Sequence, residues 1–174
     1  MANKTILYVS LAVGLLLLLS GNSAAAAVQP GMLNINSLVG YNQYATQDSV
    51  DILNNIYQEL QSRGYTNLQI LFMLSQILHE TGLFTSVANW KRINNNNFAG
   101  LTLEKGGYAA YPDISSFVDA YNGFLTKKSN PLGASDLNDF NNRLQQNGYY
   151  TADPQIYLND LQKYYNLLSN TIGQ

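Results

Sequence analysis

The sequence predicts a mainly α-helical domain that carries one short β-hairpin. Apolar residues recur at helical spacing in several segments, and residues that cap helices stand at the starts of these segments. One stretch, at about residues 99–111, instead alternates apolar and polar residues around a glycine-containing turn. The chain has 174 residues, which is the length of a single domain.

A hydrophobic leader precedes this domain, and residues 1–28 are predicted to be a signal peptide or a membrane anchor. Lys4 is the only charge in the leader, and an apolar stretch runs from Thr5 to Leu19. Small residues at 24–27 then resemble a cleavage site for signal peptidase. Because a membrane span needs roughly 20 apolar residues, the short apolar stretch favours cleavage over retention. Either outcome places the domain across or on a membrane.

A linker at residues 29–45 is expected to precede the folded domain at residues 46–174. The first predicted helix ends at Gly64, since glycine commonly follows the last turn of a helix. Thr66 and Gln69 form a capping box that opens the second helix. Apolar residues cover most of that second helix, so it is predicted to be the buried, central helix of the domain.

Three further helices are predicted in the second half of the chain. Ser116 and Asp119 are expected to open the first of them, and Gly148 to end the next. Asp153 and Pro154 supply a capping residue followed by proline at the first helical position, which opens the last helix.

The composition excludes several classes of function. Only 11% of residues are charged, against roughly 25% in an average soluble domain, and the formal net charge is -2. Lys127-Lys128 is the longest basic run, which argues against nucleic acid as a partner. The chain has no cysteine and one histidine, His79, so no metal site and no cofactor are predicted. A tyrosine- and amide-rich surface suits a neutral ligand such as sugar.

Glu80 stands out because it ends an apolar helix in a chain with few charges. It follows the apolar run 70–78 in the segment "QILHETGLF". Burial and the negative end of a helix both favour the protonated form of a carboxyl group. A carboxylic acid in this setting suits general acid catalysis, so Glu80 is the leading candidate for a proton donor.

Four ordered blocks resemble one family of enzymes. "QILHETGLFTS", "NNFAGL", "YAAYPDISSFVDAYNGFL" and "GYYTADPQIY" are similar in order and spacing to the flagellar-rod and autolysin type of peptidoglycan N-acetylglucosaminidase, glycoside hydrolase family 73. The resemblance covers about residues 48–168 and implies a lysozyme-like fold with the hairpin beside the catalytic cleft. It implies cleavage of β-1,4 bonds in peptidoglycan glycan strands, by a protein that is secreted, periplasmic or anchored facing the cell wall.

The resemblance also implies roles for individual residues. Glu80 falls on the general acid, and Tyr149 on a tyrosine that points into the active site. Six further residues are predicted to bind substrate, either because the resemblance implies it or because their rings could stack on sugar. They are Asn97, Phe98, Gly100, Tyr108, Tyr150 and Asp153. Ala152 is an extra residue relative to the family's block, which leaves the choice between Tyr149 and Tyr150 open.

The second catalytic group is left open by the sequence. The family commonly brings a second carboxylate to the cleft on a longer hairpin, and here only Glu104 and Asp113 are available. Glu104 lies at the turn of the short hairpin, and Asp113 is expected to cap a helix. Two alternatives therefore stand beside the hydrolase: a lytic transglycosylase or muramidase that uses one glutamate, and a non-catalytic wall-binding or virion module on the same fold. The oligomeric state is not predicted.

Overall fold

The computed structural model describes residue 33 and residues 47–84 and 90–172. The predicted leader and most of the predicted linker lie outside these described residues. Leu33, within the predicted linker, is buried, and its backbone N–H donates to Asn54 Oδ1 at 3.2 Å. None of the helices in the described part of the chain is long and apolar enough to cross a bilayer.

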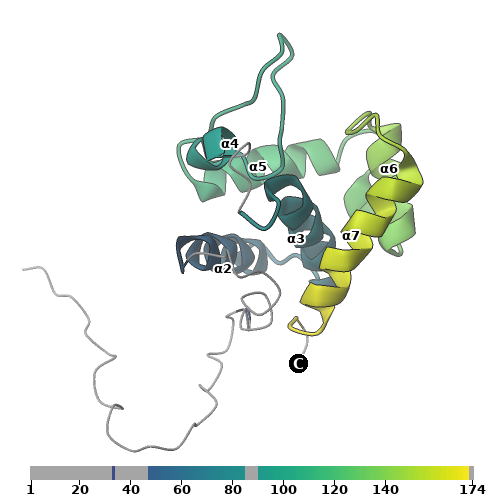
Figure 1. Ribbon diagram of the computed structural model, residues 1–174, viewed down its shortest axis with the longest axis horizontal. Helices are drawn as coiled ribbons and strands as arrows, with labels where there is room; N and C mark the ends of the chain where they lie inside the picture. The colour runs from purple at the N-terminus through teal and green to yellow at the C-terminus, as the bar shows by residue number, and fades with distance from the viewer. Residues whose placement is uncertain (1–32, 34–46, 85–89, 173–174) are drawn as a thin grey trace, which may run out of the picture.

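The fold is mainly helical, as the sequence predicts (Figure 1). The five predicted helices are all present, together with two short elements, α4 and η2, that the sequence analysis missed. Elements of five and three residues are too short to show a periodic apolar pattern. In chain order the elements are α2 (Gln47–Ser62), α3 (Asn67–Thr81), α4 (Trp90–Asn94), α5 (Ile114–Leu125), η2 (Pro131–Gly133), α6 (Leu137–Gln146) and α7 (Pro154–Ser169).

Helix α3 is the buried centre of the fold, which confirms the prediction. It lies among α2, α5 and α7 and packs most extensively along α7 (Figure 1). Phe72 on α3 stacks on Phe140 of α6, with ring centroids 4.9 Å apart. Ten residues of α3 are buried: Ile70, Leu71, Phe72, Met73, Leu74, Ser75, Gln76, Ile77, Leu78 and Thr81. A helix held on so many sides is a rigid support for the side chains at its end.

The predicted helix boundaries are mostly confirmed, because the capping residues act as expected. Gly64 and Gly148 have φ of 78° and 71°, a left-handed conformation that glycine adopts without steric cost. Thr66 and Gln69 form the capping box at the start of α3. Asp153 caps α7 by accepting hydrogen bonds from two backbone N–H groups.

We expect Thr66→Ala to lower the free energy of unfolding by about 1 kcal/mol, because the substitution leaves the Gln69 N–H of α3 without its 3.3 Å acceptor. Urea denaturation checks this value. Thr151→Ala, at an exposed position in the loop before α7, is the control and is expected to change stability by less than about 0.5 kcal/mol. Equal effects of the two substitutions would contradict a capping role for Thr66.

The start of α5 differs from the prediction. The helix begins at Ile114 rather than Ser116, because the Asp113 carboxylate accepts a 2.7 Å hydrogen bond from the Ser116 N–H. This hydrogen bond lowers the pKa of Asp113. Asp113 is therefore the helix cap that the sequence analysis also expected, and the predicted cap at Ser116, paired with Asp119, is wrong by three residues.

The predicted β-hairpin is not formed, and no strand occurs among the described residues. The segment between α4 and α5 instead projects from the helices as a narrow loop with two arms (Figure 1). One isolated antiparallel bridge, between Thr102 and Tyr108, joins the two arms. Leu101 and Ala109 are buried at the base of the loop, whereas Leu103 and Tyr108 are more than half exposed, so the outer part of the pattern has no core to pack against. A pair of short arms without a third strand is too weakly held to form a regular ladder.

Asn97 fixes the base of this loop. Its side chain is 1% exposed and donates from Nδ2 to the carbonyl oxygens of Leu101 and Ala109, at 2.8 and 2.9 Å. Its Oδ1 accepts a 2.9 Å hydrogen bond from the Leu101 N–H. One buried amide therefore takes the place of several ladder bonds and holds residues 99–101 against the end of α3.

Candidate active site

Glu80 lies in the last turn of α3, where Gly82 ends the helix with φ of 56°. Its side chain is only 19% exposed. The Tyr157 hydroxyl of α7 donates to Glu80 Oε1 at 3.1 Å. The Arg92 guanidinium of α4 lies on the other oxygen, with Nη1 3.4 Å from Oε2. The carboxyl group is therefore oriented through both of its oxygens, by side chains that come from two other helices.

Arg92 is a functional candidate that the sequence analysis missed. Its Nη2 donates to the backbone carbonyl of Glu80 at 3.0 Å, and its side chain is 14% exposed. The guanidinium also lies over the Tyr108 ring, 4.9 Å from the ring centroid, in a cation–π contact. Arg92 thus joins the projecting loop to the carboxyl group. Basic residues are scarce in this chain, which has only nine lysines and arginines, and this scarcity is the signal that could have drawn attention to Arg92.

Gly100 lies directly against the Glu80 carboxyl group. Its φ is 64°, and a Cβ added there would lie 2.5 Å from Arg92 Nη1 and 3.3 Å from Glu80 Oε2. A real Cβ does not approach another heavy atom to 2.5 Å without displacing it. The structure therefore brings together Glu80 and two predicted residues of the cleft, Gly100 and Tyr108, with Arg92 between them.

Three tyrosines stand beside the carboxyl group. Burial, and next the Glu80 charge, raise the pKa of Tyr157 far above its ordinary value, so its hydroxyl stays a proton-bearing donor to Glu80. The same two causes raise the pKa of Tyr149 well above its ordinary value. Tyr149 donates its hydroxyl to the Ala99 carbonyl oxygen. Tyr150 stacks on Tyr157, with centroids 3.9 Å apart, and donates to Asn141 Oδ1 at 2.7 Å.

The tyrosine that bonds to Glu80 is thus Tyr157, from the same sequence block as Tyr149 and Tyr150. The sequence analysis placed Tyr157 in that block but gave it no separate role. The contact could not be predicted from local sequence, because Tyr157 and Glu80 are 77 residues apart. Tyr149 and Tyr150 instead contact the Tyr157 ring, Tyr149 edge-on and Tyr150 by stacking.

We expect Tyr157→Phe to lower kcat about tenfold to a hundredfold with little change in KM. The substitution removes a hydrogen bond to a carboxyl group, an interaction that contributes about 1.5–3 kcal/mol when one partner is charged. Steady-state cleavage of soluble glycan strands measures both constants. Tyr164→Phe, on the same helix, is the matched control and should retain activity. A rise in KM alone would contradict the orienting role of Tyr157.

The other predicted site residues lie in different surroundings. Phe98 is 1% exposed and packs edge-on against Phe117, with centroids 5.1 Å apart, so it belongs to the core behind Glu80. Asp153 is at the N-terminus of α7, where it caps the helix. Glu104 is exposed near the turn of the projecting loop, and among the described residues no hydrogen bond or ion pair joins it to the Glu80 group. Substrate contacts of these residues stay predictions.

A family model described as Glucosaminidase, mannosyl-glycoprotein endo-beta-N-acetylglucosaminidase, matches residues 54–170. This span contains Glu80 and every side chain described around it. The chain belongs to the glucosaminidase family. The match confirms the resemblance to glycoside hydrolase family 73, and this glucosaminidase is a glycosidase that acts on peptidoglycan. Searches among curated proteins and among solved structures gave no match.

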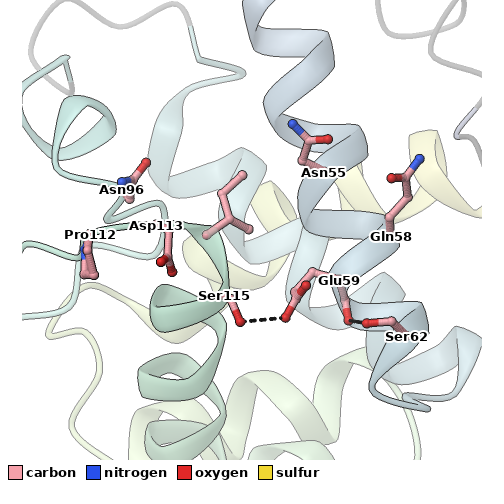
Figure 2. Close-up of a pocket in the computed structure, with 9 residues that line it drawn as sticks. Asn55, Gln58, Glu59, Ser62, Asn96, Pro112, Asp113 and Ser115 are labelled. Atoms are coloured by element: carbon pink, nitrogen blue, oxygen red, sulfur yellow. Dashed lines mark hydrogen bonds between the residues drawn. The ribbon is translucent and has the colours of Figure 1, made fainter. Parts of the chain in front are cut away.

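A hollow lined by residues other than those around Glu80 lies between α2 and the start of α5 of the glucosaminidase (Figure 2). It has a volume of about 680 Å³ and is lined by polar side chains. Glu59 on α2 accepts a 2.9 Å hydrogen bond from the Ser115 hydroxyl and also pairs with Arg63 at 2.8 Å. The hydrogen bond between Ser115 and Glu59 therefore joins α5 to α2 at the edge of this hollow. Within the described part of the chain, no group of three or more histidine or acidic side chains is arranged to hold a metal ion.

Proposed function

We propose that the protein cleaves the β-1,4 glycosidic bonds of peptidoglycan glycan strands as an endo-β-N-acetylglucosaminidase, with Glu80 as general acid. The observation that carries the proposal is the orientation of a single, mostly buried carboxyl group at the end of the central helix by Tyr157 and Arg92. A glycosidase needs one such acid to protonate the leaving oxygen as the oxocarbenium-like transition state develops. The lysozyme-like arrangement implied by the resemblance is part of the same proposal.

The two oxygens of Glu80 have different tasks in this mechanism. Oε1 accepts the Tyr157 hydroxyl, and the proposed mechanism assigns the transfer of the proton to the substrate to Oε2. The absent side chain of Gly100 leaves room for the Arg92 guanidinium beside Oε2. When Oε2 gives up its proton, negative charge develops 3.4 Å from Arg92 Nη1. Arg92 therefore stabilises the product carboxylate, an interaction that strengthens toward the transition state. Tyr108, held by Arg92, supplies a half-exposed ring for stacking on sugar.

A lytic transglycosylase is the second candidate. The position of Glu104 favours it, because Glu104 is exposed at the turn of a projecting loop and has no described bond to the Glu80 group. Without a second carboxylate across the cleft, either the N-acetyl group or the 6-hydroxyl of the substrate supplies the nucleophile. Attack by the 6-hydroxyl would form an anhydro sugar.

Digestion of purified peptidoglycan by the full chain, followed by mass spectrometry of the fragments, distinguishes these candidate functions. New reducing ends on N-acetylglucosamine support the glucosaminidase, and ends on N-acetylmuramic acid indicate a muramidase. Anhydro-muramic ends indicate the transglycosylase. Binding of peptidoglycan without any product from the unaltered protein would leave only the wall-binding module.

We also propose that the leader at residues 1–28 delivers this domain to the cell wall, as a secreted, periplasmic or membrane-anchored enzyme. The apolar stretch and the small residues after it support this proposal. The mass of the protein recovered from the cell-wall fraction distinguishes a cleaved leader from a retained one. Recovery only from the cytosol would overturn the proposal.

A further inference from the structure

A pocket of about 280 Å³ adjoins the Glu80 group and has no role in the mechanism above. It lies between the first arm of the projecting loop, helix α5 and the segment that follows α6. Its walls include Gly100, Leu101, Tyr111, Phe124, Lys127 and Tyr149.

Two of these walls are shared with the Glu80 group. Gly100 lines the pocket, and a Cβ on Gly100 would lie 3.3 Å from Glu80 Oε2. Tyr149 lines the pocket with a ring whose centroid is 6.5 Å from that of Tyr157, the donor to Glu80. A sugar whose glycosidic oxygen reaches Oε2 therefore has one of its substituents within reach of this pocket.

The remaining walls combine apolar side chains with polar groups. Phe124 packs on Tyr149, with ring centroids 5.3 Å apart, and Ala120 lies one turn earlier on α5. Lys127 is exposed and brings a positive charge to the rim, in a chain with only nine basic residues. Its backbone is fixed, because Asn147 Nδ2 donates to the Lys127 carbonyl at 3.2 Å and ties it to the segment that carries Tyr149.

We propose that this pocket receives the lactyl substituent of N-acetylmuramic acid and that Lys127 binds the carboxylate that this substituent carries. That carboxylate is the lactyl carboxylate itself where the stem peptide is absent, and a carboxylate of the stem peptide where the lactyl carboxyl is amidated. The inference rests on the proposed function, and it names the part of the substrate that this site distinguishes. A β-1,4 glycan of N-acetylated sugars is itself uncharged, and negative charge enters peptidoglycan only through the lactyl group and the stem peptide attached to it. A pocket that combines aromatic rings and polar groups with a cation is complementary to a short carbon chain that ends in a carboxylate.

Binding by the full chain carrying Glu80→Gln tests the proposal without degradation of the ligand. Three soluble ligands of equal length are titrated: peptide-bearing glycan strands, strands whose peptides have been removed by an amidase, and chitin oligomers. Lys127→Met is expected to weaken binding about tenfold on muramic acid strands that present a carboxylate at the pocket, peptide-bearing or amidase-treated, as for a lost charged hydrogen bond. Lys127→Arg should restore most of the affinity. Lys128→Met, at the adjacent exposed lysine, is the matched control and should change no affinity.

The ligands separate the two sources of the carboxylate. A loss only on amidase-treated strands, whose lactyl carboxyl is free, identifies the lactyl carboxylate as the group that Lys127 binds. A loss only on peptide-bearing strands, whose lactyl carboxyl is amidated, identifies a carboxylate of the stem peptide, and a loss on both means that Lys127 binds either one. Chitin oligomers should bind equally with and without Lys127. An equal loss on all three ligands, or no loss on any, overturns the proposal. If the unaltered chain binds with this Lys127 dependence but cleaves nothing, the proposed function fails and the pocket assignment stands.

Discussion

Glu80→Gln is expected to lower the rate of peptidoglycan cleavage by about 10²- to 10⁴-fold, the usual contribution of a general acid. Glutamine has nearly the same shape and keeps an oxygen that can accept the Tyr157 hydroxyl, which donates at 3.1 Å in the unaltered protein. It has no acidic proton to give to the leaving oxygen. Release of soluble fragments from purified peptidoglycan, followed over time, measures the loss.

Retained binding and folding separate this loss from a structural defect. The new amide nitrogen would face Arg92 Nη1 in place of Oε2, so the Tm is measured on the same preparations. We expect the variant to sediment with peptidoglycan as the unaltered protein does. Cleavage at the unaltered rate would exclude Glu80 as the general acid.

Glu104→Gln makes the same chemical change at an exposed carboxyl group, and it tests whether Glu104 is the second catalytic carboxylate. Activity within about twofold of the unaltered protein is expected if the substrate supplies the second group. A loss of the size expected for Glu80→Gln would instead identify Glu104 as the second carboxylate, and the loop would then have to approach Glu80 when glycan binds.

The sequence was sufficient for those parts of the fold that depend on local signals. Helix ends at Gly64 and Gly148 and the capping box at Thr66 and Gln69 follow from backbone conformation and short-range hydrogen bonds. The apolar residues on most sides of α3 are also a local signal, and they predicted its central position. The hairpin was wrong because alternation in residues 99–111 reports only a local pattern. In three dimensions only the base of that segment joins the core, through Leu101 and Ala109, and no third strand extends the pair of arms.

The candidate site was only partly predictable, because its parts meet through long-range contacts. Glu80 and Gly100 were found through an unusual charge and a short motif. Arg92 was missed because its role depends on the position of α4, a helix of five residues with no periodic signal. Tyr157 lay within a recognised block, but its contact with Glu80 depends on the packing of α7 along α3.

Gly100→Ala is expected to lower cleavage about 100-fold. The added Cβ would lie 2.5 Å from Arg92 Nη1 and 3.3 Å from Glu80 Oε2, so the guanidinium or the loop must move. A displacement of about 1 Å at a catalytic group can cost a hundredfold in rate. The φ of 64° adds strain of about 1–2 kcal/mol for a residue with a side chain, which is lost from the free energy of unfolding.

Gly106→Ala separates the collision from the strain. Gly106 has φ of 85°, so alanine there meets a similar backbone penalty, but nothing lies within 4 Å of the added Cβ. Both variants should therefore unfold at somewhat lower urea concentration, and only Gly100→Ala should lose activity. Kinetics and denaturation on the two proteins decide between the outcomes. Equal losses of activity would mean that strain in the loop, rather than crowding of the Arg92–Glu80 pair, limits the reaction.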